Sequence, residues 1–336
     1  MSEAYYTEHP FAQYVRILGK GKNGARPLTQ EEARNAMRMI LANEIEPVQL
    51  GAFMMLMRVK EETSEELAGF IQAARDSFQL PTGITADLDW SSYAGKRRHL
   101  PWFILSTLLL AENGIKVFMH GTTGHTNGRI YTDEVLPILG IQPATSLSEA
   151  AQQLTNNNFS YLSLKYLAPK LQEIIDFRPL MGLRSPIHTV ARMLNPFNAD
   201  YMMQGVYHPG YRSVHQEAAL LLKQPHLAVL KGEGGEIEKD PDMECLVQSV
   251  HQTELVDETW PPLFSLRHVK ETVMEPKHLL AVWRGESSDE FGEGATTGTA
   301  AIALRLMGKA NHVEEAQQMA QAMWDNRIKQ KYGNAT

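Results

Sequence analysis

The sequence lacks features that several classes of protein require. Its 336 residues include one cysteine, Cys245, which excludes an intrachain disulfide and any multi-cysteine metal site. No stretch approaches the roughly 20 consecutive apolar residues of a membrane-spanning helix, and the N-terminus MSEAYYTEHP lacks the pattern of an export signal. The histidines include no pair at zinc-binding spacing supported by a third ligand. We therefore expect a cytoplasmic protein that neither enters a membrane nor binds a metal.

The charge of the chain is unevenly distributed. A net charge of −7 argues at first against a polyanion ligand, because nucleic-acid binding is largely neutralisation of phosphates by Lys and Arg. Residues 232–295, however, contain 15 acidic against 5 basic residues, so this stretch carries −10 and the rest of the chain +3. An anion responds to the local potential, so the chain can still present a basic face to a ligand.

The first 80 residues have the pattern of helices. Thr29 is followed by Glu32, and Thr63 by Glu66, which is the spacing of a capping box at a helix start. Methionines recur along this part of the chain and predict a core or a helix-packing surface: Met37, Met39, Met54, Met55 and Met57. The pattern predicts a small all-helical domain of residues 1–80, and we expect it to carry the contact of a homodimer.

From residue 81 onward, short apolar runs alternate with helical stretches. Examples of the runs are IKVFMHG, PHLAVLKGEGG and KHLLAVW. This alternation predicts an α/β domain of residues 81–336, ending in two helices that meet at residues 308–311. The fold class is therefore α/β, with a small all-helical N-terminal domain.

Two short cationic stretches are candidates for phosphate contacts. Residues 94–99 read AGKRRH and lie between an extended segment and an apolar helix, where many enzymes bind phosphate. The second stretch, GKGKNGAR, combines three cations with flexible glycines. From the residues alone, each stretch is either a phosphate contact or a solvated loop.

The order of these segments resembles the anthranilate phosphoribosyltransferase family from about residue 14 to residue 329. The resemblance is carried by the N-terminal helices, by FRPLMGLRSPIHTVARMLNPF, by GVYHP and by AIALRLMGKA. It implies a helical domain that usually forms a homodimer, a larger domain of nucleoside phosphorylase/phosphoribosyltransferase type, and a site in the cleft between them.

The chain departs from the family pattern around the phosphate site. AGKRRH replaces the GTGGDG loop that wraps a diphosphate, and EGGEIE replaces the adjacent Asp-Glu pair that holds magnesium. FILST keeps Ser106 and Thr107, and MHGTTGHTNGR replaces KHGNR. Arg178 and Arg184 keep the family's spacing, whereas Arg192 replaces a glycine-proline region. Glycines and asparagines are lost where cations are gained.

This combination resembles the YbiB-like paralogues of the family, which are regarded as nucleic-acid-binding homodimers. Our first hypothesis is therefore a homodimer that binds nucleic acid, with DNA the expected form, through a basic cleft and with little sequence preference. It requires no cofactor and no catalytic residue. The expected contacts are Lys20, Lys22, Arg26, Lys96, Arg97, Arg98, Ser106, Thr107, Arg178, Arg184 and Arg192.

Two alternatives stay open. In the first, the protein is a pentosyltransferase that uses phosphoribosyl pyrophosphate with Mg²⁺, and the residues to watch are Ser106, Thr107, Arg178 and Glu238. In the second, it is a non-catalytic interaction module whose acidic region 232–295 meets a protein partner.

Overall fold

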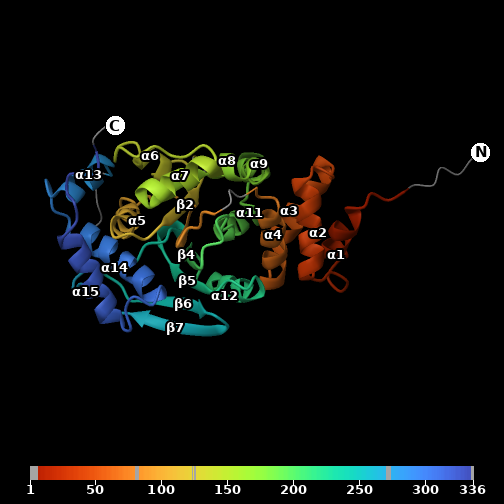
Figure 1. The fold of residues 1–336 in the computed structure, drawn as a ribbon. Coiled ribbons are helices and arrows are strands. Elements are labelled where there is room, and N and C mark those ends of the chain that lie inside the picture. The colour runs from red at the N-terminus through yellow and green to blue at the C-terminus, as the bar shows by residue number, and fades with distance from the viewer. Residues whose placement is uncertain (1–6, 80–82, 123, 125, 270–273, 334–336) are drawn as a thin grey trace, which may run out of the picture.

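The computed structural model describes residues 7–79, 83–122, 124, 126–269 and 274–333. Within them, the N-terminal part forms a helical bundle, coloured red to orange in Figure 1. Its helices are α1 (Ala12–Gly19), α2 (Gln30–Leu41), α3 (Pro47–Lys60) and α4 (Ser64–Asp76). Both predicted capping boxes are present, since Thr29 and Thr63 accept hydrogen bonds from the backbone N–H groups of Glu32 and Glu66. The predicted domain boundary, between residues 80 and 81, lies outside the described residues.

The larger part of the chain is built on a seven-stranded sheet in the order β3-β2-β1-β4-β5-β6-β7. The first five strands in this order run parallel, and β6 and β7 add an antiparallel hairpin at one edge. The strands are β1 (Leu88–Ser92), β2 (Val117–Gly121), β3 (Phe159–Ser163), β4 (Tyr201–Val206), β5 (His226–Lys231), β6 (Cys245–His251) and β7 (Glu254–Trp260). This confirms the predicted fold class, an α/β domain preceded by a helical one.

Helices cover both faces of the sheet, which is why β1, β2 and β3 are buried along their whole length. Neighbouring strand residues alternate between two cores: Met202 packs in a core with α7, α9, α12 and the N-terminal bundle, and Met203 packs in a core with α5, α14 and α15. The helices are α5 (Phe103–Glu112), α6 (Thr132–Val135), α7 (Leu147–Asn157), α8 (Leu164–Leu167), α9 (Pro169–Asp176), α10 (Arg178–Met181), α11 (Ile187–Val190), α12 (Tyr211–Leu221), α13 (Lys277–Arg284), α14 (Glu290–Leu306) and α15 (Val313–Asp325), with 3-10 turns η1 (Ala191–Met193) and η2 (Glu233–Gly235). None of the described helices is long and apolar enough to cross a membrane.

The helical bundle packs against the α/β domain through α4, as Figure 1 shows. The Arg75 guanidinium donates hydrogen bonds to the carbonyl oxygens of Met193 (2.9 Å) and Leu194 (3.0 Å). These carbonyls belong to the segment that also carries Arg192, so the bundle braces part of the candidate site.

The methionines of the bundle are mostly interior. Met37, Met39, Met54 and Met57 are buried, which supports the prediction of a core. The exposed apolar residues of α3 are valines rather than methionines: Val48 is 78% exposed and Val59 is 83% exposed. Because they are eleven residues apart, they lie on one face of the helix. This α3 face is the better candidate for a dimer contact.

Candidate phosphate-binding site

The candidate site lies at the carboxyl ends of the parallel strands. Strands β1 and β4 are neighbours, and the chain leaves them toward opposite edges of the sheet. Open α/β sheets bind ligands at such a switch point. Loop 94–98 follows β1, and a turn of residues 232–238 (turn 232–238) follows β5, next to β4.

The backbone of loop 94–98 is already occupied by carboxylates of turn 232–238. The N–H groups of Ala94 and Gly95 donate to Glu236 Oε1, at 2.5 and 2.7 Å. Those of Arg97 and Arg98 donate to Glu233 Oε1, at 3.1 and 2.7 Å. Four backbone donors that could bind a phosphate therefore bind the protein's own side chains.

Lys96 points into the protein rather than toward solvent. Its side chain is 2% exposed, and its ammonium lies 2.5 Å from Glu238 Oε1 and 3.1 Å from Glu233 Oε2. Burial alone would lower the pKa of Lys96, but the charges of Glu238 and Glu233 outweigh it and raise the pKa. Burial raises the pKa of Glu238 to about 7 despite the nearby ammonium. The prediction that Lys96 contacts phosphate is corrected: its charge is used inside the protein.

Glycines allow turn 232–238 to approach loop 94–98 this closely. A Cβ on Gly232 would lie 1.8 Å from the carbonyl oxygen of Glu236, and one on Gly205 would lie 2.5 Å from it. Gly234 and Gly235 have φ angles of +69° and +96°, which glycine adopts without strain. These glycines therefore let the turn fold tightly on itself and against β4, and Glu233 and Glu236 then lie beside loop 94–98.

Four arginines gather beside these two segments, and we call them the arginine cluster: Arg129, Arg178, Arg184 and Arg192. Arg178 and Arg184 both reach the Thr126 hydroxyl, and Arg129 donates to the carbonyl oxygen of Ala94 at 2.9 Å. Burial, followed by the charges of the three other arginines, lowers the pKa of Arg184 to about 10. Arg129, Arg184 and Arg192 form no ion pair with a carboxylate among the described residues.

Arg129 and Arg192 are held in place by backbone carbonyl oxygens. Arg192 is 8% exposed and donates to the Gly235 carbonyl at 3.0 Å, and burial lowers its pKa. The buried Nε of Arg129 has no hydrogen-bond acceptor among the described residues. Partly desolvated guanidiniums that lie this close together favour an anion that can neutralise part of their charge.

The remaining predicted contacts separate into exposed and buried residues. Arg97 and Arg98 are exposed on loop 94–98, and Lys20, Lys22 and Arg26 are exposed on the helical bundle, where Arg26 pairs with Glu32 at 2.7 Å. Ser106 and Thr107 are fully buried in α5, where they donate to the carbonyls of Thr296 and Ile104. The expectation that Ser106 and Thr107 contact phosphate is therefore corrected, because they have no exposed surface.

Arg129 is the member of the cluster that the sequence analysis did not select. It ends the segment MHGTTGHTNGR, which aligns with the family's KHGNR and shares its final arginine. This shared arginine is the feature of the sequence that could have identified Arg129 as a candidate contact.

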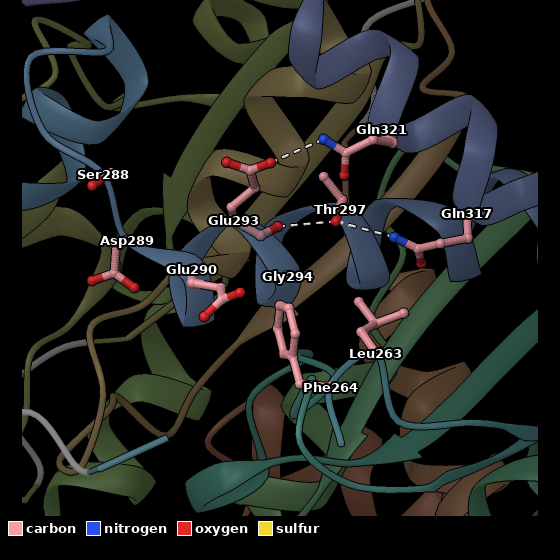
Figure 2. Close-up of a pocket in the computed structure, with 10 residues that line it drawn as sticks. All are labelled: Leu263, Phe264, Ser288, Asp289, Glu290, Glu293, Gly294, Thr297, Gln317 and Gln321. Atoms are coloured by element: carbon pink, nitrogen blue, oxygen red, sulfur yellow. Dashed lines mark hydrogen bonds between the residues drawn. The ribbon is translucent and has the colours of Figure 1, made fainter. Parts of the chain in front are cut away.

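A pocket of about 470 Å³ lies between the start of α14, α15 and Leu263–Phe264 (Figure 2). In Figure 2, Gln321 donates to Glu293 at 2.9 Å and Gln317 to Thr297 at 3.1 Å, so these amides connect α15 to α14. Asp289, Glu290 and Glu293 line the pocket. Three carboxylates disfavour a phosphate, so this pocket is not the anion site.

The fold is that of a phosphoribosyltransferase-type protein, and carboxylates of the chain itself occupy the backbone donors of loop 94–98. The glycosyl transferase family's helical bundle domain matches residues 13–78. An uncharacterised protein of Aquifex aeolicus is 30% identical over 243 residues, which are 72% of this chain and 73% of that protein. Anthranilate phosphoribosyltransferase of Syntrophomonas wolfei is 26% identical over 92% of both chains. The crystal structure of that enzyme (TrpD) from Thermus thermophilus aligns with a TM-score of 0.79 at 20% identity, covering 94% of both chains.

The chain belongs to the TrpD-like anthranilate phosphoribosyltransferase family. The uncharacterised protein YbiB of Escherichia coli is 27% identical over 60% of this chain and 64% of its own length. That identity is close to the values for the named enzymes, so a closer relationship to YbiB remains a hypothesis.

Proposed function

We propose that this protein is a homodimer that binds the phosphates of nucleic acid through the arginine cluster and the exposed Arg97 and Arg98, with little sequence preference. The observation that carries the proposal is the contrast between two neighbouring anion sites. The backbone donors of loop 94–98 have internal carboxylate partners, whereas the four guanidiniums beside them lie so close together that burial and the charges of the other three lower the pKa of Arg184 to about 10. An external anion is therefore attracted to side chains rather than to the loop backbone.

The chemistry of these side chains suits a nucleic-acid backbone. Arginine presents several N–H donors to a phosphate and remains charged at neutral pH, even where burial and neighbouring arginines lower its pKa. Contacts with phosphates position a strand without reading its sequence. Lys20, Lys22 and Arg26 would extend the contact onto the helical bundle, although Arg26 must then give up its pairing with Glu32.

The second candidate is phosphoribosyl transfer, which the named relatives favour. In this reading, Mg²⁺ and phosphoribosyl pyrophosphate would bind at loop 94–98 and turn 232–238. The residues present do not fit them: the Lys96 ammonium bridges Glu233 and Glu238, where a cation shared by two carboxylates would lie, and Glu236 is engaged by backbone N–H groups. We therefore derive no transfer step.

The test is binding to labelled oligonucleotides of unrelated sequence over a salt series. Replacing Arg97 and Arg98 with alanine should weaken binding equally for all sequences. The plot of log affinity against log salt should become shallower by about 0.9 per lost duplex contact, or about 0.7 on a single strand. The matched control is Lys309→Ala/Lys329→Ala, which removes two exposed cations from the C-terminal helical segment. If the Arg97/Arg98 variant binds with the affinity and salt dependence of the wild type, loop 94–98 is not part of the interface. If the wild-type protein does not bind the oligonucleotides, the proposal is refuted.

A further inference from the structure

Large apolar side chains are exposed in the segments that carry the arginine cluster or adjoin it. Tyr207, which directly follows β4, is 56% exposed. Leu180 and Leu183 lie between Arg178 and Arg184 in the sequence and are 85% and 49% exposed. Single exposed apolar residues are common on protein surfaces, but their concentration in the segments of one charged cluster indicates a ligand with apolar as well as anionic groups.

Tyr207 lies next to the guanidinium of Arg192. A Cβ placed on Gly235 would lie 3.2 Å from the backbone nitrogen of Tyr207 and 3.3 Å from Arg192 Nη2, so both groups flank the same glycine. The Tyr207 ring meets the His208 ring edge to face, with centroids 4.8 Å apart and an interplanar angle of 85°. Such a contact covers at most one face of the tyrosine ring. Because the side chain is also more than half exposed, a ring face is available to a ligand beside the cluster.

The tyrosine and the arginines fit the two parts of a single nucleic-acid strand. An unpaired base has an open π-face that stacks on an aromatic ring, and the phosphates on either side of the base pair with guanidiniums. In a duplex the bases are stacked on one another, so an exposed tyrosine finds no base face and only the phosphates are within reach.

We infer that Tyr207 stacks on an unpaired base and that the ligand of the arginine cluster is single-stranded nucleic acid. This inference rests on the proposed function and adds to it the form of the nucleic acid. The phosphate contacts of the cluster supply affinity that falls with salt, whereas stacking on Tyr207 supplies affinity that does not depend on the charge of the strand.

The experiment is a fluorescence-anisotropy titration of three labelled probes with the full-length protein: a thymidine single strand, a strand of the same length with abasic residues throughout, and a duplex. The wild-type protein should bind the thymidine strand at least about fivefold more tightly than the abasic strand, since stacking on an aromatic side chain contributes about that factor or more per base. At raised salt, which weakens the phosphate contacts of every probe, the thymidine strand should bind the most tightly of the three.

Tyr207→Ala should lose this factor on the thymidine strand and should bind the abasic strand and the duplex as the wild type does. The matched control, Tyr207→Phe, keeps the ring and should bind all three probes like the wild type. Because the Tyr207 side chain is exposed, both variants should fold, and an unchanged affinity for the abasic strand verifies this in the same titration.

The outcomes separate this inference from the proposed function. If Tyr207→Ala binds the thymidine strand as tightly as the wild type does, or loses equally on the abasic strand, Tyr207 does not stack on a base and the inference fails. It also fails if the duplex binds the most tightly at raised salt. In each of these cases the wild-type protein still binds nucleic acid through phosphates, so the proposed function stands. If the wild-type protein binds none of the probes, both are refuted.

Discussion

Replacing Lys96 with methionine should destabilise the protein without weakening its phosphate contacts. The lysine is 2% exposed and pairs with Glu238, which is equally buried, and with Glu233. Removing one member of a buried ion pair costs up to about 3–5 kcal/mol, because the carboxylate left behind must either stay charged without a partner or take up a proton. For a domain of this size, that corresponds to a fall in melting temperature of roughly 6–15 °C.

The cost should depend on pH in a defined direction. Burial raises the pKa of Glu238 to about 7, above its ordinary value, so its contribution to stability is present at low pH and is lost as pH rises through 7. Without the Lys96 ammonium, this pKa rises further, and Glu238 stays protonated in the folded state. The variant should therefore lose about 1.4 kcal/mol more than the wild type for each pH unit above 7, until Glu238 ionises in the variant too.

Thermal and urea unfolding at pH 6, 7.5 and 8.5 would measure both effects. The double variant Lys96→Met/Glu238→Gln removes both charges with similar volume and should recover most of the loss, since replacing a whole buried pair is often nearly neutral. The salt slope of nucleic-acid binding should stay at the wild-type value for Lys96→Met, in contrast to the Arg97/Arg98 variant. The reasoning is refuted if the single variant is as stable as the wild type at pH 8.5, or if the double variant is no more stable than the single one.

Three further predictions test other parts of the molecule. Val48→Glu/Val59→Glu should convert a dimer into monomers by sedimentation velocity, while Leu255→Glu, on the exposed β7 strand, should not; an unchanged dimer would exclude the α3 face. Product fluorescence with anthranilate, phosphoribosyl pyrophosphate and Mg²⁺ should stay at background, and turnover near roughly 1 per second would establish an enzyme instead. Burial lowers the pKa of His215 to about 3, so on acidification this histidine is protonated in the unfolded chain before it is protonated in the folded protein. The free energy of unfolding should therefore fall by about 3 kcal/mol between pH 6.5 and 4. Urea unfolding of His215→Gln should not show this loss.

Local sequence signals were sufficient for the fold but not for the site. The capping boxes at Thr29 and Thr63 involve residues three positions apart, so the chain itself displays them. The three adjacent cations Lys96, Arg97 and Arg98 carry no local pattern that shows which of them faces solvent. Lys96 turns inward to pair with carboxylates, whereas Arg97 and Arg98 turn outward. The sequence does not display this difference, because those carboxylates lie about 140 residues further along the chain. Only the tertiary structure brings loop 94–98 and turn 232–238 together.

The arginine cluster was predictable only in part, because its members come from separate segments of the chain. Arg178, Arg184 and Arg192 were selected from one segment that resembles the family, whereas Arg129 comes from a different loop, after β2. The buried state of Ser106 and Thr107 could not be read from the family motif either. Helix α5 is apolar on nearly every side, so it packs into the core and takes both hydroxyls with it.

The positions of the glycines connect the filled loop to the proposed function. A diphosphate is bound most selectively by a glycine-rich loop, because its backbone donors have a fixed spacing that few other anions match. In this chain, loop 94–98 keeps the donors and one glycine, Gly95, while the glycines of turn 232–238 bring two carboxylates onto those donors. In the proposed function, an external anion binds to guanidiniums, which recognise charge and planar geometry but do not require a diphosphate. A polymer of phosphates can bind such guanidiniums at many positions along its length. Filling the backbone donors with carboxylates and leaving guanidiniums for the ligand therefore disfavours a nucleotide-sized substrate and favours a long polyanion.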